Sequence, residues 1–200
     1  MSFARRSIFV WSASSNASHM IEGIALPSSI VLTVCGQGRA YNFIRVGRMV
    51  QNSEWGPHLW KILHTCAEKC GKQSIQMLHE DEIRAFIHLL QIVDAILPCT
   101  LCEKHYREWR MKRPPAFLGK TPAEFHAAAT HWVWELHNHV NQMRGVAVMP
   151  FSEDFGTKDL QESLKNLMEV LHRARLQRLI SADSIREWSY RLKRFLTVCG

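Results

Sequence analysis

A proline followed by two cysteines divides the middle of this 200-residue chain. Pro98 ends the apolar helical pattern before it, and Cys99 and Cys102 stand at the head of the next pattern. Two thiols three residues apart can close a small disulfide ring, and the partial positive charge at a helix N-terminus lowers the pKa of a cysteine. The same spacing supplies half of a zinc site. The segment therefore predicts either a redox-active pair or a zinc half-site between two helices.

Apolar residues on both sides of the cysteines recur at helical spacing. The fourth pattern has a clear start, because Thr121-Pro122-Ala123-Glu124 is a capping box with proline at the first helical position. No strand-like alternation and no internal repeat is evident. The sequence predicts an all-α fold, a four-helix bundle, with helices over residues 53–70, 79–97, 99–109 and 121–144 that end near Gly71, Pro98, Pro114 and Gly145.

The two ends of the chain differ from this central part. Residues 1–50 lack a sustained period, so we expect a poorly ordered extension; its early arginines and serines are typical of a targeting segment, and part of it resembles vector-derived sequence. Residues 51–150 form the predicted domain, and residues 151–200 an additional amphipathic helical extension. The apolar stretch 24–34 is too short to cross a membrane and contains Pro27, so no membrane span is predicted.

Charge and cysteine content narrow the functional classes. The formal net charge is +7, but much of the excess lies in the C-terminal extension, where it alternates with leucines as on a solvated helix face. We therefore predict no nucleic-acid role. Six cysteines are too few and too irregularly spaced for a disulfide-stapled secreted mini-protein. Cys66 and Cys70 are expected to be buried like small hydrophobic residues, while Cys35 and Cys199 are unpaired in the sequence and could act as a shuttle.

Two further motifs accompany the cysteine pair. The segment from Trp55 to His64 reads WGPxxWxxLH, the segment from Leu97 to Tyr106 reads LPCxxCxxHY, and the segment from His137 to Asn141 reads HNxVN. In this order the three motifs resemble the Erv/ALR family of FAD-linked sulfhydryl oxidases over roughly residues 54–144. Their form is most similar to the compact versions carried by large DNA viruses.

The resemblance implies a reaction and a set of site residues. Thiol-containing protein substrates would reduce the disulfide at Cys99, Cys102 would pass the electrons to FAD, and oxygen would reoxidise the flavin to give hydrogen peroxide. A homodimer packed through the first two helices is expected, and no metal. The residues implied to bind FAD are Gly56, Trp60, His64, His105, Tyr106, His137, Asn138, Val140 and Asn141.

The chain also departs from the cellular members of that family. No cysteine lies between Cys102 and Cys199, so the second structural disulfide is missing, and there is no separate Cys-x-x-Cys shuttle. Two alternatives therefore stay open: a zinc-stabilised interaction module with Cys66, Cys70, Cys99 and Cys102 as ligands, and a catalytically degenerate scaffold that binds FAD. The compartment is open too, being host cytoplasm or virion for a viral protein and the mitochondrial intermembrane space for a cellular one.

Overall fold

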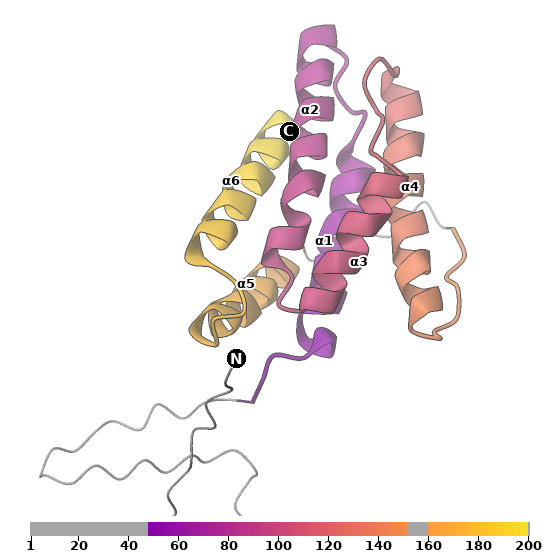
Figure 1. Cartoon of the computed structure of the whole chain (residues 1–200). Coiled ribbons are helices and arrows are strands. Elements are labelled where there is room, and N and C mark those ends of the chain that lie inside the picture. Colours follow the sequence, from indigo (N-terminus) through magenta and orange to yellow (C-terminus); the bar gives the residue numbers. More distant parts are fainter. Residues whose placement is uncertain (1–47, 152–159, 200) are drawn as a thin grey trace, which may run out of the picture. The chain divides into compact units, whose positions relative to one another are not determined.

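The computed structural model describes residues 48–151 and 160–199, and every regular element in these ranges is helical. The all-α prediction is therefore confirmed for this part of the chain, while the predicted N-terminal extension, including Cys35, lies almost entirely outside the described residues. The elements are α1 (Asn52–Lys69), α2 (Gln76–Ile92), the 3-10 helix η1 (Val93–Ile96), α3 (Thr100–Lys112), α4 (Pro122–Met143), α5 (Leu160–Leu176) and α6 (Ala182–Val198) (Figure 1).

The ends of α1 explain how it is set against α4. At its start, Gln51 and Glu54 form a capping box, in which the Gln51 backbone N–H donates to the Glu54 carboxylate over 2.8 Å. After its end, Gly71 has a φ of +74°, and a Cβ there would lie 2.2 Å from the Pro122 carbonyl oxygen. Glycine is thus required twice, by the backbone conformation and by the close approach of the first turn of α4.

The predicted second helix, residues 79–97, differs from the observed one at both ends. The α-helix begins at Gln76 and ends at Ile92, and the chain then tightens into η1 before Pro98. A proline disfavours the helical conformation of the residue before it, which explains why the helix cannot reach Leu97. Asp94 of η1 accepts a hydrogen bond from Arg107 Nε over 2.8 Å. This bond ties the turn to α3.

The predicted start of α4 is confirmed in detail. The Thr121 hydroxyl accepts from the Glu124 backbone N–H over 3.4 Å, and the Glu124 carboxylate accepts from the Thr121 backbone N–H over 2.9 Å. From there α4 runs to Met143 and packs along α1. Its buried face includes Phe125, Ala129, Trp132, Val133 and Leu136.

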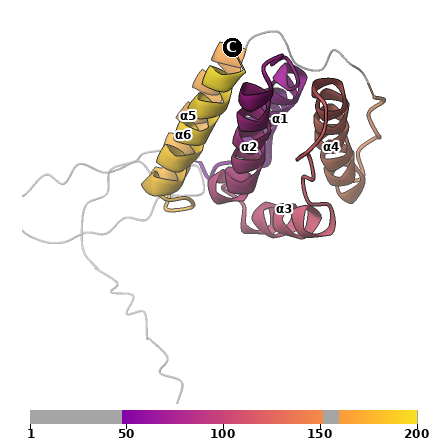
Figure 2. The ribbon, with the colours of Figure 1, turned by 90° about the horizontal axis from the view of Figure 1, so that it is seen from above.

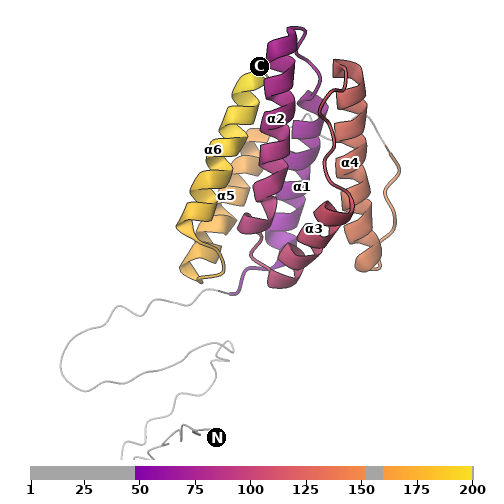
Figure 3. The same cartoon turned by 45° about the horizontal axis from the view of Figure 1, so that its top comes forward.

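The C-terminal helices complete the same core. In Figure 2 the middle layer of α1 and α2 lies between α4 on one side and α5 with α6 on the other, and Figure 3 shows the same order. Helix α5 packs along α1, and α6 packs along α2. Leu167, Leu171 and Phe195 are fully buried, and the centroid of the Phe195 ring lies 5.3 Å from that of Phe86 on α2. The chain from residue 47 onwards is one compact unit, and a domain boundary near residue 150 stays a prediction.

None of the described helices combines the length and the apolar composition that a bilayer span requires.

Candidate active site

The two cysteines of the central motif are joined by a disulfide at the start of α3. Cys99 and Cys102 have Cα atoms 5.2 Å apart. Cys99 is the N-cap of the helix, and its sulfur accepts a hydrogen bond of 3.2 Å from the backbone N–H of Cys102. Both residues are half-buried. A disulfide held at a helix N-terminus is suited to thiol exchange, because the unpaired N–H groups stabilise negative charge on sulfur.

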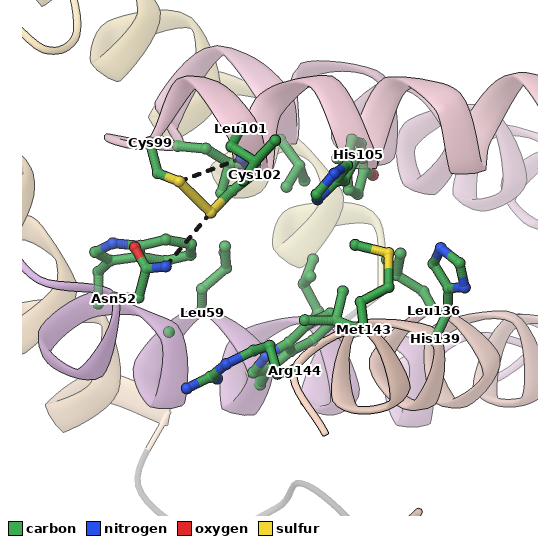
Figure 4. Close-up of a pocket in the computed structure, with 18 residues that line it drawn as sticks. Asn52, Leu59, Cys99, Leu101, Cys102, His105, Leu136, His139, Met143 and Arg144 are labelled. Carbon is green, nitrogen blue, oxygen red and sulfur yellow. Dashed lines mark hydrogen bonds between the residues drawn. A yellow bond between two sulfur atoms is a disulfide. The ribbon is translucent and has the colours of Figure 1, made fainter. Parts of the chain in front are cut away.

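A cavity of about 250 Å³ lies beside this disulfide, enclosed by α1, η1, α3 and α4 (Figure 4). Its wall is mostly apolar and aromatic, and both cysteines belong to it. Five of the residues predicted to bind a cofactor line it, namely Gly56, Trp60, His105, Tyr106 and Val140. The fold therefore brings parts of all three sequence motifs to one cavity.

Helix α4 turns a different face to the cavity from the one that the sequence motif suggested. The lining residues are Leu136, His139, Val140 and Met143, which lie three, four and seven positions apart and so share one helix face. The motif pointed to His137 as a cavity residue. The cavity wall contains His139 instead, which occupies the variable position of the HNxVN motif. In the sequence, the helical spacing of His139 to Leu136 and Met143 is what indicates that the three residues share a helix face.

His137 lies behind Trp60, away from the cavity wall. Its ring stacks on Trp60 with ring centroids 4.1 Å apart and an angle of 9°. Its Nδ1 shares a hydrogen bond of 3.0 Å with Nε2 of His64. The pKa of each imidazole is lowered to about 4, mainly by burial, and for His64 the neighbouring His137 contributes to this lowering. Both rings are thus neutral at pH 7, and the pair supports the Trp60 ring from behind.

The two asparagines of the HNxVN motif bind backbone groups of the following loop. The Asn138 amide donates to the Met149 carbonyl over 2.9 Å and accepts from the Met149 N–H over 2.8 Å. Asn141 is buried, and its backbone carbonyl accepts from the Val146 N–H over 2.8 Å. Neither side chain lines the cavity. Direct cofactor contacts by His64, His137, Asn138 and Asn141 remain a prediction.

Two tryptophans offer unused hydrogen-bond donors. The indole nitrogens of Trp55 and Trp109 are buried and have no acceptor among the described residues, and the same holds for Trp188 on α6, which lines neither of the cavities at this site. Trp55 lines the main cavity, and Trp109 lines a smaller one of about 120 Å³. His105 and His139 lie in the walls of both cavities, which therefore adjoin. Because a buried donor without a partner is costly, these N–H groups fit a ligand with acceptor atoms.

Tyr106 has a structural bond in addition to its place in the wall. Its hydroxyl donates to the Leu90 carbonyl over 2.6 Å, and burial raises its pKa. The hydroxyl is therefore engaged between α3 and α2, and the ring face is what Tyr106 presents to the cavity.

The remaining described cysteines are buried thiols. Cys66, Cys70 and Cys199 are all free and buried, and burial raises the pKa of each thiol, that of Cys66 to about 12. Such thiols are poor nucleophiles at neutral pH. The expectation that Cys66 and Cys70 are buried is confirmed. In the described part of the chain, no three histidine, cysteine or acidic residues are grouped so that they could hold a metal ion.

Comparison with known proteins identifies the family. The Erv1/Alr family profile matches residues 57–161, which is more than half of the chain and includes the cavity's main walls. This chain belongs to the Erv1/Alr family. The predicted resemblance is thereby confirmed.

Two proteins similar to this Erv1/Alr chain are both named FAD-linked sulfhydryl oxidases. The FAD-linked sulfhydryl oxidase ERV1 of Oryza sativa subsp. japonica is 29% identical over 97 residues, which cover 48% of this chain and 45% of that protein. An FAD-linked sulfhydryl oxidase of African swine fever virus (isolate Pig/Kenya/KEN-50/1950) is 24% identical over 99 residues, covering 50% of this chain and 75% of the viral protein. The match thus spans less than half of the plant relative. No solved structure gives a significant match.

Proposed function

We propose that this Erv1/Alr protein is an FAD-dependent thiol oxidase that forms disulfides in dithiol or protein substrates. The observation that carries the proposal is the Cys99–Cys102 disulfide in the wall of an aromatic cavity. The plant and the viral relative both bear the name FAD-linked sulfhydryl oxidase. In this function the disulfide is the redox-active pair, and the cavity beside it holds a planar cofactor.

The residues present fit a flavin. The cavity approaches the range of about 300–1,000 Å³ typical of small-molecule pockets and has aromatic walls and free indole donors. Beside Gly56, no atom lies within 4 Å of the position that a Cβ would take. Gly56, Trp60, His105, Tyr106 and Val140 would hold the cofactor directly, with His64, His137, Asn138 and Asn141 in support. Bound flavin would supply an acceptor for two electrons and pass them to oxygen, giving hydrogen peroxide.

The thiol chemistry belongs to the two cysteines. A substrate thiolate attacks the Cys99 sulfur, forming a mixed disulfide and releasing Cys102 as a thiolate. The second substrate thiolate then attacks the first substrate sulfur in the mixed disulfide, and Cys99 leaves as a thiolate. The Cys102 backbone N–H, 3.2 Å from the Cys99 sulfur, stabilises that leaving group. The substrate ends as a disulfide and the pair at α3 as a dithiol.

Oxygen uptake with dithiothreitol tests this proposal. The purified protein should be yellow, should release hydrogen peroxide, and should lose turnover on Cys99→Ser or Cys102→Ser while keeping its FAD, because cofactor affinity comes mostly from other contacts. Cys66→Ala is the matched control, since it removes a buried thiol outside the cavity wall. Colourless protein with stoichiometric zinc would favour the interaction module. Bound FAD without turnover would favour the degenerate scaffold.

The C-terminal helices pack on the two helices through which the homodimer is expected to form. The resemblance places the dimer contact on the first two helices, but in this chain α5 packs along α1 and α6 along α2. Those helices thus already have partners within the chain. A homodimer of this protein would therefore use faces of α1 and α2 that α5 and α6 leave free, and the mass of the purified protein in solution distinguishes a dimer from a monomer.

A further inference from the structure

We infer that Asn52 is a further catalytic residue, which stabilises the Cys102 thiolate when the disulfide opens. The Asn52 side-chain amide donates to the Cys102 sulfur over 3.5 Å (Figure 4). None of the three sequence motifs includes this residue, which lies fifty positions before the cysteine. The inference rests on the proposed function, because a thiolate forms at Cys102 only when a dithiol reduces the pair.

The chemistry requires a donor at this sulfur. Attack of a substrate thiolate on Cys99 forms one sulfur–sulfur bond and breaks the bond to Cys102, which takes the electron pair and becomes a thiolate. A leaving thiol departs faster when its pKa is lower. A hydrogen bond to a charged partner is stronger than one to a neutral partner, so the amide stabilises the thiolate more than it stabilises the disulfide. Asn52 therefore favours both the opening of the disulfide and its reduced form.

The start of α1, which carries Asn52, is held by Arg173 on α5 and by Gln177, the residue that follows the end of α5. Just before α1, the Gln177 amide accepts from the Val50 N–H over 3.1 Å and donates to the Arg48 carbonyl over 3.0 Å. In the first turn, Arg173 pairs with Glu54 over 2.6 Å. These three contacts lie on both sides of Asn52 in the sequence and fix the start of α1 relative to the C-terminal end of α5.

The other groups that can influence the Cys102 thiolate lie in or beside the cavity wall. The ionisable groups in that wall besides the cysteines and the bonded Tyr106 are His105 of α3 and His139 and Arg144 of α4. Helix α1 and η1 add no ionisable side chain to it. The acidic residues in the first turns of α1 and α3 are Glu54 and Glu103. All of them stay the same when Asn52 alone is changed, so a difference between variants reports on the amide.

The pKa of Cys102 tests the inference directly. In the full chain carrying Cys99→Ser, the rate of Cys102 alkylation by iodoacetamide is followed against pH by peptide mass spectrometry. We expect Asn52→Leu to raise this pKa by about one unit, the size of one charged hydrogen bond. Asn52→Asp, which adds a negative charge at the same size, should raise it at least as much. Ser53→Ala, an exposed neighbour on the same turn, should leave it unchanged.

A second measurement uses the intact pair. At a pH above the Cys102 pKa measured in the first assay, equilibration with dithiothreitol should show the Cys99–Cys102 disulfide of Asn52→Leu about tenfold harder to reduce, equivalent to a potential about 30 mV more negative. An unchanged Cys102 pKa in Asn52→Leu overturns the inference, and Asn52→Ala, which removes the same amide with a smaller side chain, gives the answer if Asn52→Leu fails to fold. Neither assay needs FAD or oxygen. Failure of oxidase activity would therefore refute the proposed function and leave this result standing.

Discussion

At the scale of single residues, the buried His64–His137 pair makes the stability of the fold depend on pH. Both imidazoles have a pKa of about 4 because burial penalises the charged ring. In the unfolded chain an imidazole has a pKa near 6.5. Above pH 6.5 both states are neutral, and below it the unfolded state takes up protons first. The free energy of unfolding therefore falls as the pH drops from about 6.5 towards 4.

We expect this loss to be visible in the melting temperature between pH 6.5 and 5. Over the full range down to pH 4, His64 accounts for up to about 3 kcal/mol, and the less buried His137 for less. His137→Gln should flatten the decline, because it removes one titrating ring and the charge next to His64. His131→Gln, on the exposed side of α4, is the control. The same pH slope in both variants would contradict the assignment.

The single residues also show what the sequence could and could not predict. The spacing of Cys99 and Cys102 left a disulfide and a zinc half-site open, and the motifs around the pair favoured the disulfide that the structure has. The places of Trp60, His105 and Val140 in the cavity wall agree with their motif positions. The Asn52 contact could not be predicted, because it joins two helix starts whose meeting depends on tertiary packing. The direction of the His137 side chain could not be predicted either. A motif says which residues are present, but the rotation of α4 against α1 decides which of them face the cavity.

At the scale of elements, one glutamine joins the last third of the chain to the start of α1. Gln177 binds the backbone of Arg48 and Val50 with both atoms of its amide. Gln177→Ala removes two hydrogen bonds, so we expect a loss of about 1–3 kcal/mol in stability. Hydrogen exchange at the Val50 amide should become faster, and the Cys102 pKa should rise as in Asn52→Leu, by a smaller amount.

Gln161→Ala is the matched control for that experiment, since Gln161 is an exposed glutamine in the first turn of α5, the helix that ends just before Gln177. It should leave the Val50 exchange rate unchanged. Equal protection of Val50 in both variants would show that α5 does not hold the start of α1 in solution.

Helix boundaries were predictable where a local signal marks them. The capping box that begins at Thr121 and the helix end near Gly71 each depend on a few neighbouring residues, and the structure has both. The change from α2 to η1 was not predictable from apolar spacing, because a 3-10 turn continues the apolar pattern while changing the direction of the chain. The bond from Arg107 to Asp94, between residues of two elements, stabilises that turn.

At the scale of the whole molecule, the C-terminal helices belong to the core that carries the site. The amphipathic pattern of residues 160–198 predicted helices with one apolar face, but periodicity alone does not say what that face covers. In the structure it covers α1 and α2, the helices that present Trp60 and support α3. The chain from residue 47 onwards should therefore unfold as one cooperative unit.

Phe195→Ala tests this cooperativity. Phe195 is fully buried against Phe86, so its removal leaves a cavity that costs about 3–5 kcal/mol. For a folded unit of this size we expect the melting temperature to fall by roughly 10 °C, in a single transition seen alike by helical circular dichroism and tryptophan fluorescence. Tyr190→Ala, which removes an exposed aromatic ring from the same helix, should change it little. Two separate transitions, with Phe195→Ala shifting only one, would instead show that α5 and α6 fold apart from the helices that carry the disulfide.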